Sequence, residues 1–202
     1  MQGLILIGHY LVSLYTMIVL LRFLAQWLGV DFRNPISQFI VNITNPPLLP
    51  LRRVVPGWRG KDMASLVLAL GLIFIELLLF ALLFGAKNYL ALIPIVFFRA
   101  IIVVINLYFY ILIINAIISW INQDPYHPAR LFFSPITAPL LRPLQKRIPL
   151  LGGAVDVTPM IVLVLIYFLQ IQLPLWFSSA MQGIGLAGND PAINALIGLM
   201  SR

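Results

Sequence analysis

Length, composition and charge place the chain in a membrane before any motif is considered. It has 202 residues, of which 61% are apolar and 9% are charged, against about a quarter charged in a soluble domain. The absence of cysteine excludes disulfides, iron–sulfur ligation, a cysteine zinc site and a thiol nucleophile. The net charge of +7 is also typical of nucleic-acid binding, but a basic cytoplasmic face explains it better, so we expect no direct contact with nucleic acid.

Four apolar stretches are long enough to cross a bilayer, which takes about 20 residues. They cover residues 4–28, 64–84, 95–120 and 159–177. Pro94 and Arg99 precede or open the third stretch, and we expect this lead-in to lie at the membrane interface. The sequence therefore predicts an all-α transmembrane fold with four spans.

The C-terminal tail, residues 181–202, is too rich in glycine to predict a fifth span. Asn189, Asp190 and Pro191 have the composition of a helix start. We expect residues 192–200 to form a short helix on the surface, and a re-entrant segment is the alternative.

Basic residues concentrate in two of the loops. The loops between spans one and two and between spans three and four hold Arg33, Arg52, Arg53, Arg59, Lys61, Arg130, Arg142, Lys146 and Arg147. Because cytoplasmic loops carry an excess of lysine and arginine, we expect both long loops in the cytoplasm and both termini on the opposite side.

A shift of 93 residues aligns the chain with itself, which predicts an internal duplication. The matched pairs are Trp27 and Trp120, Asp31 and Asp124, Pro35 and Pro128, Phe39 and Phe132, Thr44 and Thr137, Pro46 and Pro139, and Pro50 and Pro143. We expect unit one over residues 1–88, unit two over 89–180 and the tail over 181–202. Each unit holds two spans around a proline-rich interfacial segment (35–56 or 128–149), so the units are predicted to be parallel about an axis along the membrane normal.

The interfacial segment of each unit is predicted to be amphipathic. In the first, Asn34 and Pro35 start a helix whose apolar face carries Ile36, Phe39, Ile40 and Ile43, with Ser37, Gln38 and Asn42 on the other face. Pro46, Pro47 and Pro50 are expected to break this helix and redirect the chain. Basic residues beside apolar anchors attract anionic lipid, so Arg52, Arg53, Lys146, Arg147, Phe39 and Phe132 are candidates for a lipid or partner platform. Alternatively, the basic residues only fix the topology.

At these residues the chain resembles the YggT family of bacterial and plastid membrane proteins. The matching stretches are RFLAQWLGVDFRNPISQFIVNITNPPLLPLRRVVP from Arg22 and ISWINQDPYHPARLFFSPITAPLLRPLQKRIPLLGGAVDVTP from Ile118. The resemblance implies a multi-pass protein of a bacterial inner membrane, with periplasmic termini in the orientation above. Members have been linked to osmotic or potassium tolerance, to haem attachment to a b-type cytochrome in plastids, and to nucleoid or division organisation. The family has no enzymatic motif, so the resemblance supplies no catalytic residues.

Polar residues inside the spans are costly and usually face a bundle interior. Glu76 aligns with Gln170 after one inserted residue, Ser13 with Asn106, and Arg22 with Asn115. We expect this set to face the axis between the units. It then forms either an ion site centred on Glu76 or hydrogen bonds that join helices, with Glu76 paired to Gln170 or Asn106.

The remaining polar residues indicate structure rather than chemistry. Asp31, Asp62, Asp124 and Asp156 lie beside prolines and arginines and are expected to cap helices. His9 is expected to be a packing or interfacial residue, and two histidines on opposite sides make a metal or haem site improbable. The sequence thus favours a non-enzymatic scaffold without cofactors, whose partners are anionic lipids, other membrane proteins or further copies of itself. An ion transporter or channel component around Glu76 is the alternative.

Overall fold

The computed structural model describes residues 2–58, 60–121, 124, 126–147, 157–187 and 190–199, and these residues fold as helices joined by short connections. Asp156, Asn189 and Arg59 lie outside the described residues. The elements are α1 (Gln2–Trp27), α2 (Pro35–Val54), α3 (Met63–Leu83), the 3-10 turn η1 (Tyr89–Ala91), α4 (Leu92–Ile121), α5 (Pro128–Gln145), α6 (Thr158–Gly183) and α7 (Pro191–Leu199). Among the described residues there is no β-strand beyond one isolated bridge, between Trp58 and Lys61.

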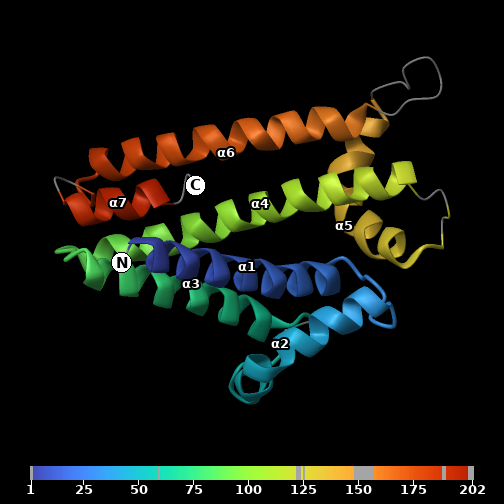
Figure 1. Cartoon of the computed structure of the whole chain (residues 1–202), viewed down its shortest axis with the longest axis horizontal. Helices are drawn as coiled ribbons and strands as arrows, with labels where there is room; N and C mark the ends of the chain where they lie inside the picture. Colours follow the sequence, from blue (N-terminus) through green and yellow to red (C-terminus); the bar gives the residue numbers. More distant parts are fainter. Residues whose placement is uncertain are drawn as a thin grey trace.

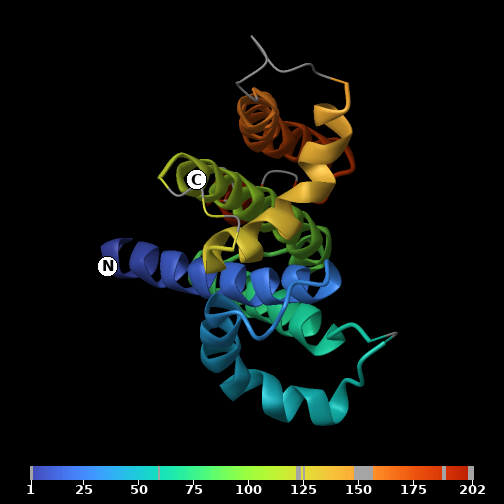
Figure 2. The ribbon, with the colours of Figure 1, turned by 90° about the vertical axis from the view of Figure 1, so that its right-hand side faces the viewer.

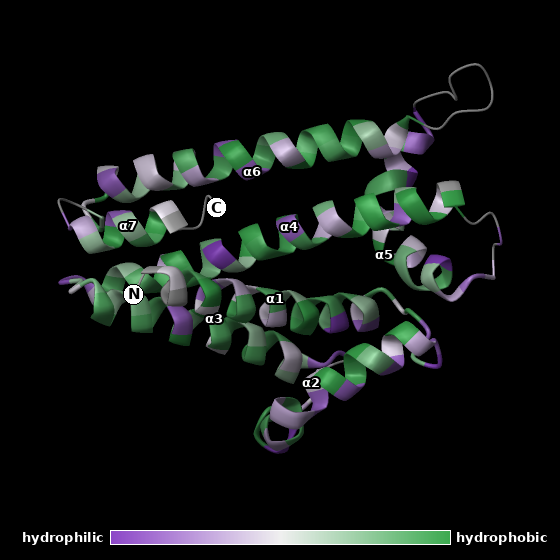
Figure 3. Cartoon of the chain, viewed as in Figure 1, coloured by the Kyte–Doolittle hydropathy of each residue, from purple (hydrophilic) through white to green (hydrophobic). Residues whose placement is uncertain are grey.

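Four of these helices are long and apolar enough to cross a membrane, as predicted. The candidate spans are Leu6–Trp27, Met63–Leu83, Tyr89–Ser119 and Thr158–Gly183. Figure 3 shows them as the mostly hydrophobic parts of the ribbon, with hydrophilic residues gathered toward the loops and the short helices. The third span begins earlier than predicted, at Tyr89, which puts Arg99 inside it rather than in a lead-in, and the fourth continues past residue 177 to Gly183.

The spans lie side by side, with α4 in the middle of the bundle. α1 packs against α3, α4 contacts both, and α6 packs against α4. The connection at one end of the bundle carries α2 between α1 and α3, and α5 holds the corresponding place between α4 and α6 (Figure 1). The N-terminus, η1 and the start of α7 lie at the opposite end. The two proline-rich helices therefore share one end of the bundle.

Both proline-rich helices continue through their prolines, contrary to the predicted break. α2 contains Pro46, Pro47 and Pro50, and α5 contains Pro135, Pro139 and Pro143. Proline removes one backbone donor and its ring clashes with the carbonyl four residues earlier, so it kinks a helix that neighbouring contacts hold in place. Figure 2 shows the bend of α2, viewed from the end of the bundle where both helices lie.

The buried face of α2 also differs from the predicted one. Ser37 was expected on the polar face, but it is buried together with Ile40, Thr44 and Leu48. Phe39 is 64% exposed, whereas Phe132, at the aligned position of α5, is fully buried in the cluster between the spans. The stripe that faces the bundle thus includes two hydroxyl side chains, because they find hydrogen-bond partners there.

α7 packs one side against the bundle and leaves the other side exposed. It lies alongside α6 and runs back along it toward the middle of the bundle (Figure 1). Ala192, Ile193, Leu196 and Ile197 are at most 4% exposed and join residues of α3 and α4 in one apolar cluster. Nine residues of helix extend about 13 Å, less than half of an apolar layer of about 30 Å. α7 is thus too short to cross the layer, and its expected place at the membrane surface stays a prediction.

Candidate functional site

A buried cluster of polar and charged side chains joins α1, α3 and α4 near the N-terminal end of α1. His9 Nδ1 lies 2.6 Å from Glu76 Oε1. Arg99 Nη2 donates to Ser13 Oγ at 2.9 Å and lies 3.4 Å from His9 Nε2. All four side chains are buried, and Ser13 also lines a cavity of about 510 Å³ between α1 and α4.

The chemistry of Arg99 determines which ring nitrogen of His9 donates and which accepts. Arginine has only donors, so the His9 Nε2 that faces Arg99 must accept. The other ring nitrogen, Nδ1, then carries the proton and donates to the Glu76 carboxylate. The His9 ring thus lies between the Arg99 guanidinium and the Glu76 carboxyl group, which have opposite formal charges. The cluster can therefore join α1, α3 and α4 through side-chain contacts.

The structure brings the predicted intramembrane residues together in a different pairing. Glu76 contacts His9 and not Gln170, whose Nε2 donates instead to Asn106 Oδ1 at 2.9 Å. Ser13 accepts from Arg99. The predicted pairing of Glu76 with Gln170 or Asn106 is therefore wrong, because Glu76 meets His9 of the neighbouring α1. That the set faces an axis between the units stays a prediction.

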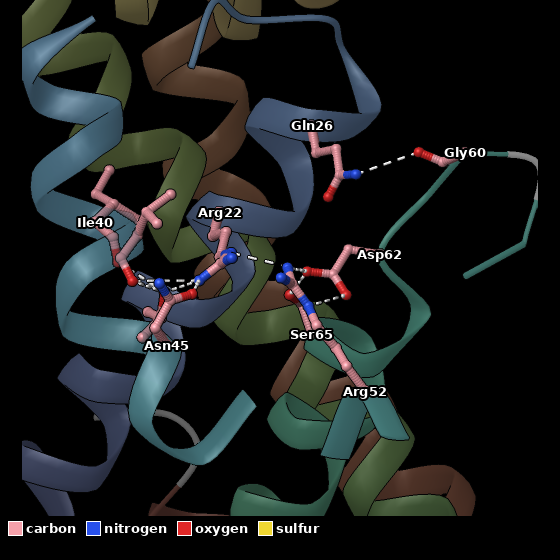
Figure 4. Close-up of polar contacts among 10 residues, drawn as sticks. Arg22, Gln26, Ile40, Asn45, Arg52, Gly60, Asp62 and Ser65 are labelled. Carbon is pink, nitrogen blue, oxygen red and sulfur yellow. Dashed lines mark hydrogen bonds and ion pairs between the residues drawn. The ribbon is translucent and has the colours of Figure 1, made fainter. Parts of the chain in front are cut away.

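A second network fixes α2 to the spans at the opposite end of the bundle (Figure 4). Arg22 Nη1 donates to Thr44 Oγ1 at 2.5 Å and to Asn45 Oδ1 at 2.9 Å. Arg22 Nε lies 3.7 Å from Asp62 Oδ2, so α1, α2 and the start of α3 meet at one guanidinium. Arg22 is only 4% exposed, and its role in the structure is that of an anchor.

Asp62, the residue before α3, collects donors from two directions. It accepts from Arg52 of α2 and from Ser65 Oγ at 2.8 Å. Burial raises the pKa of Asp62, but the hydrogen bonds from Arg52 and Ser65 and the charges of Arg52 and Arg22 outweigh it, and the pKa falls below the ordinary 3.8. Arg52, predicted as part of the platform, is therefore committed to an internal ion pair.

The second half of the chain attaches α5 at the aligned positions with neutral groups. Asn115 Nδ2 donates to Thr137 Oγ1 at 3.3 Å, and Ser134 Oγ donates to Asn115 Oδ1 at 3.4 Å. Asn115 corresponds to Arg22 and Thr137 to Thr44 at the shift of 93 residues. The same pair of positions thus connects span to platform helix in both halves.

A further tyrosine contact supports the bend of α2. Pro47 has no N–H, so the carbonyl of Ile43 loses its usual helical donor. The Tyr15 hydroxyl donates to that carbonyl at 3.4 Å. A side chain of α1 thus replaces part of what the proline removes.

The repeated aspartates and prolines build the turns that lead into α2 and α5. Asp31 Oδ1 accepts from the Arg33 N–H at 2.9 Å, and Asp124 Oδ1 accepts from the Tyr126 N–H at the same distance. Pro35 and Pro128 occupy the first turns, capped by the side chains of Asn34 and His127. Asp31 and Asp124 thus shape the turns into α2 and α5.

Several residues of the predicted platform and of the repeat motif are exposed. Arg53 at the end of α2, and Lys146 and Arg147 after α5, are exposed, as are Pro46, Pro50, Pro139 and Pro143. Trp27 is 47% exposed, and the Lys61 ammonium lies 5.0 Å from the centre of its ring. The side chain of Trp120 lies outside the described residues. No group of three or more metal-ligating side chains occurs in the described part of the chain.

Sequence reasoning missed the partners of Glu76. His9 was assigned to packing and Arg99 to the interface, yet both complete the buried cluster. The sequence did contain a signal, because the candidate spans hold only three charged residues: Arg22, Glu76 and Arg99. Oppositely charged residues within spans tend to pair with one another.

Comparison with known proteins gives the relationship of the chain. The family model described as CCB3/YggT matches residues 1–83 and 94–177. The chain is 37% identical over 163 residues to YggT of Escherichia coli K12, covering 79% of this chain and 82% of that one. It is 38% identical over 165 residues to a Pseudomonas aeruginosa protein, covering 73% and 76%. No solved structure matches. The resemblance seen in the sequence is confirmed, and the chain belongs to the CCB3/YggT family.

Proposed function

We propose that this protein is a non-enzymatic scaffold or assembly factor of a bacterial inner membrane. The observation that carries the proposal is the placement of α2 and α5 at one end of the bundle, each tied to the spans by side-chain hydrogen bonds. Fixed helices with exposed basic residues at their ends offer a surface for anionic lipid and for membrane proteins. Further copies of the chain are a third class of partner.

We place this platform in the cytoplasm, with the N-terminus and the start of α7 on the periplasmic side. The excess of arginine and lysine around α2 and α5 supports that orientation. The family match supports two parallel units. Its matched stretches begin at residues 1 and 94, which are 93 residues apart. That distance equals the shift that aligns the sequence with itself.

A pull-down of the full-length protein from detergent-solubilised membranes, with mass spectrometry, tests the scaffold. Arg53, Lys146 and Arg147 are neutralised to glutamine, while Arg52 is kept because it pairs with Asp62. We expect the triple variant to insert normally and to lose partners. A matched control replaces Lys87, an exposed basic residue at the opposite end, and should keep them. An unchanged partner set in the triple variant would contradict the proposal.

The second candidate function is an ion transporter or channel component, and the buried Glu76 cluster favours it. A carboxylate with His9 and Arg99 inside the spans is the kind of group found along ion and proton paths. The measurement is rescue of growth under osmotic or potassium stress in a strain lacking the protein. Transport through Glu76 predicts that Glu76→Gln abolishes rescue while the protein stays folded, whereas the scaffold predicts that folded Glu76→Gln still rescues.

A further inference from the structure

The bend of α5 creates a basic groove that α2 does not have. Two adjoining cavities of about 380 and 280 Å³ share Pro135 and Arg142. Arg130 and Arg142 both line the smaller cavity, with Ser134 between them. In a straight helix twelve residues extend about 18 Å, so the prolines in this stretch bring two distant arginines around one hollow.

The lining of the groove combines cationic and apolar surface. Besides the two arginines, Leu131, Pro135 and Ser134 line the smaller cavity, and Leu28 and prolines of α5 line the larger one. None of the described residues lining either cavity is acidic. Guanidinium groups bind phosphate by paired, charge-assisted hydrogen bonds, and the Ser134 hydroxyl offers one further polar group.

The corresponding surface of α2 lacks these features. Ser37 stands 93 positions before Arg130, and Leu49 stands 93 positions before Arg142. Ser37 is buried against the bundle. The pair of arginines is therefore particular to the second half, and general attraction of lipid to both basic helices does not explain it.

We propose that this groove binds the headgroup of an anionic phospholipid, with the phosphate paired to Arg130 and Arg142 and the apolar portion of the lipid against Leu28 and the prolines. The inference rests on the proposed membrane-surface position of α5 and adds a ligand and a site to it. A free phosphate ion would use the arginines but would leave the apolar lining of the larger cavity uncovered, which favours the lipid.

The test is native mass spectrometry of the full-length protein in detergent, with phosphatidylglycerol or phosphatidylcholine of the same chains added. We expect a phosphatidylglycerol adduct that phosphatidylcholine does not form. Arg130→Gln with Arg142→Gln should weaken it about thirtyfold, because two basic groups act together. The control Arg53→Gln with Arg147→Gln removes the same charge outside the groove and should keep the adduct.

Equal loss in both double variants, or loss in neither, would overturn the site. If the groove variant does not fold, Ala138→Leu fills the larger cavity without changing charge and should also remove the adduct. An adduct that survives Ala138→Leu counts against the groove. The readout involves no protein partner, so a failed pull-down and a failed lipid site are distinguishable results.

Discussion

The two halves of the chain use the same positions for polar contacts but fill them with different chemistry. In the first half, an arginine on α1 holds the threonine of α2, whereas an asparagine on α4 holds the threonine of α5. Likewise, Glu76 contacts a histidine whose other ring nitrogen faces an arginine, while Gln170, aligned with Glu76, pairs with an asparagine.

This difference indicates that position and polarity are shared at the two aligned pairs, Arg22 with Asn115 and Glu76 with Gln170, while only the first-half member of each pair carries a charge. Hydrogen bonds to charged groups contribute about 1.5–3 kcal/mol, against about 0.5–1.5 kcal/mol for neutral ones. The first half should therefore depend more strongly on each polar side chain. The second half holds α5 by weaker contacts, and α5 is also the helix with the basic groove.

The largest expected effect lies at the buried charges. Glu76→Ala leaves Arg99 buried without its counter-charge, which should cost about 3–5 kcal/mol. Gln170→Ala removes only a neutral bond between helices, about 0.6 kcal/mol. Thermal unfolding in detergent, followed by circular dichroism, measures both. Similar losses for the two variants would contradict the charge asymmetry.

The aligned phenylalanines should differ almost as much. Phe132 is fully buried and Phe39 is 64% exposed. Phe132→Ala should cost roughly 3 kcal/mol through the cavity that it leaves, while Phe39→Ala should change stability little. The same unfolding assay measures both variants, and a costly Phe39→Ala would mean that Phe39 is covered in the folded protein.

Asp62 should make the first half sensitive to acid. Its pKa is depressed in the folded protein, so its contribution is present above its unfolded value of 3.8 and is lost as pH falls through the lower folded value. Asp62→Asn should cost about 2 kcal/mol at neutral pH and should flatten the decline in stability as pH falls from about 5 to below 3.8. Unfolding midpoints measured over this pH range test the prediction. An equally steep decline in the variant would contradict the role assigned to Asp62.

The smallest effect separates the two threonines. Thr44→Val removes the 2.5 Å acceptor of a buried arginine and should cost about 1.5 kcal/mol. Thr137→Val removes a 3.3 Å contact with an amide and should cost about 0.5 kcal/mol. Both variants keep the side-chain shape, so the difference between their losses of stability measures the difference between the two hydrogen bonds. A larger loss for Thr137→Val would reverse the comparison.

The spans were predictable because length and apolar composition alone determine them. The start of α2 was too, since Asn34 is a good cap residue and Pro35 has the backbone angle of a first helical turn. The course of α2 after Pro46 was not predictable, because a proline ends or merely bends a helix according to contacts elsewhere, here those of Tyr15 and Arg22.

The partners of the polar residues were also beyond the sequence. Alignment places Glu76 opposite Gln170 by analogy, but hydrogen bonds form between the helices that touch. α1 and α3 are in close contact, so Glu76 meets His9. The burial of Ser37 shows the same limit, because its hydroxyl reaches the Asp31 carbonyl at 2.8 Å and so tolerates the interior.

The inward course of α7 affects how topology is mapped in this protein. Its apolar side packs against residues of α3, α4 and α6. A reporter joined directly to α7 would therefore act on a helix that belongs to this packed cluster. Lys87 is exposed at the end of the bundle where α7 begins. A reporter inserted beside Lys87 would show which side of the membrane this end faces, without displacing α7 from the bundle.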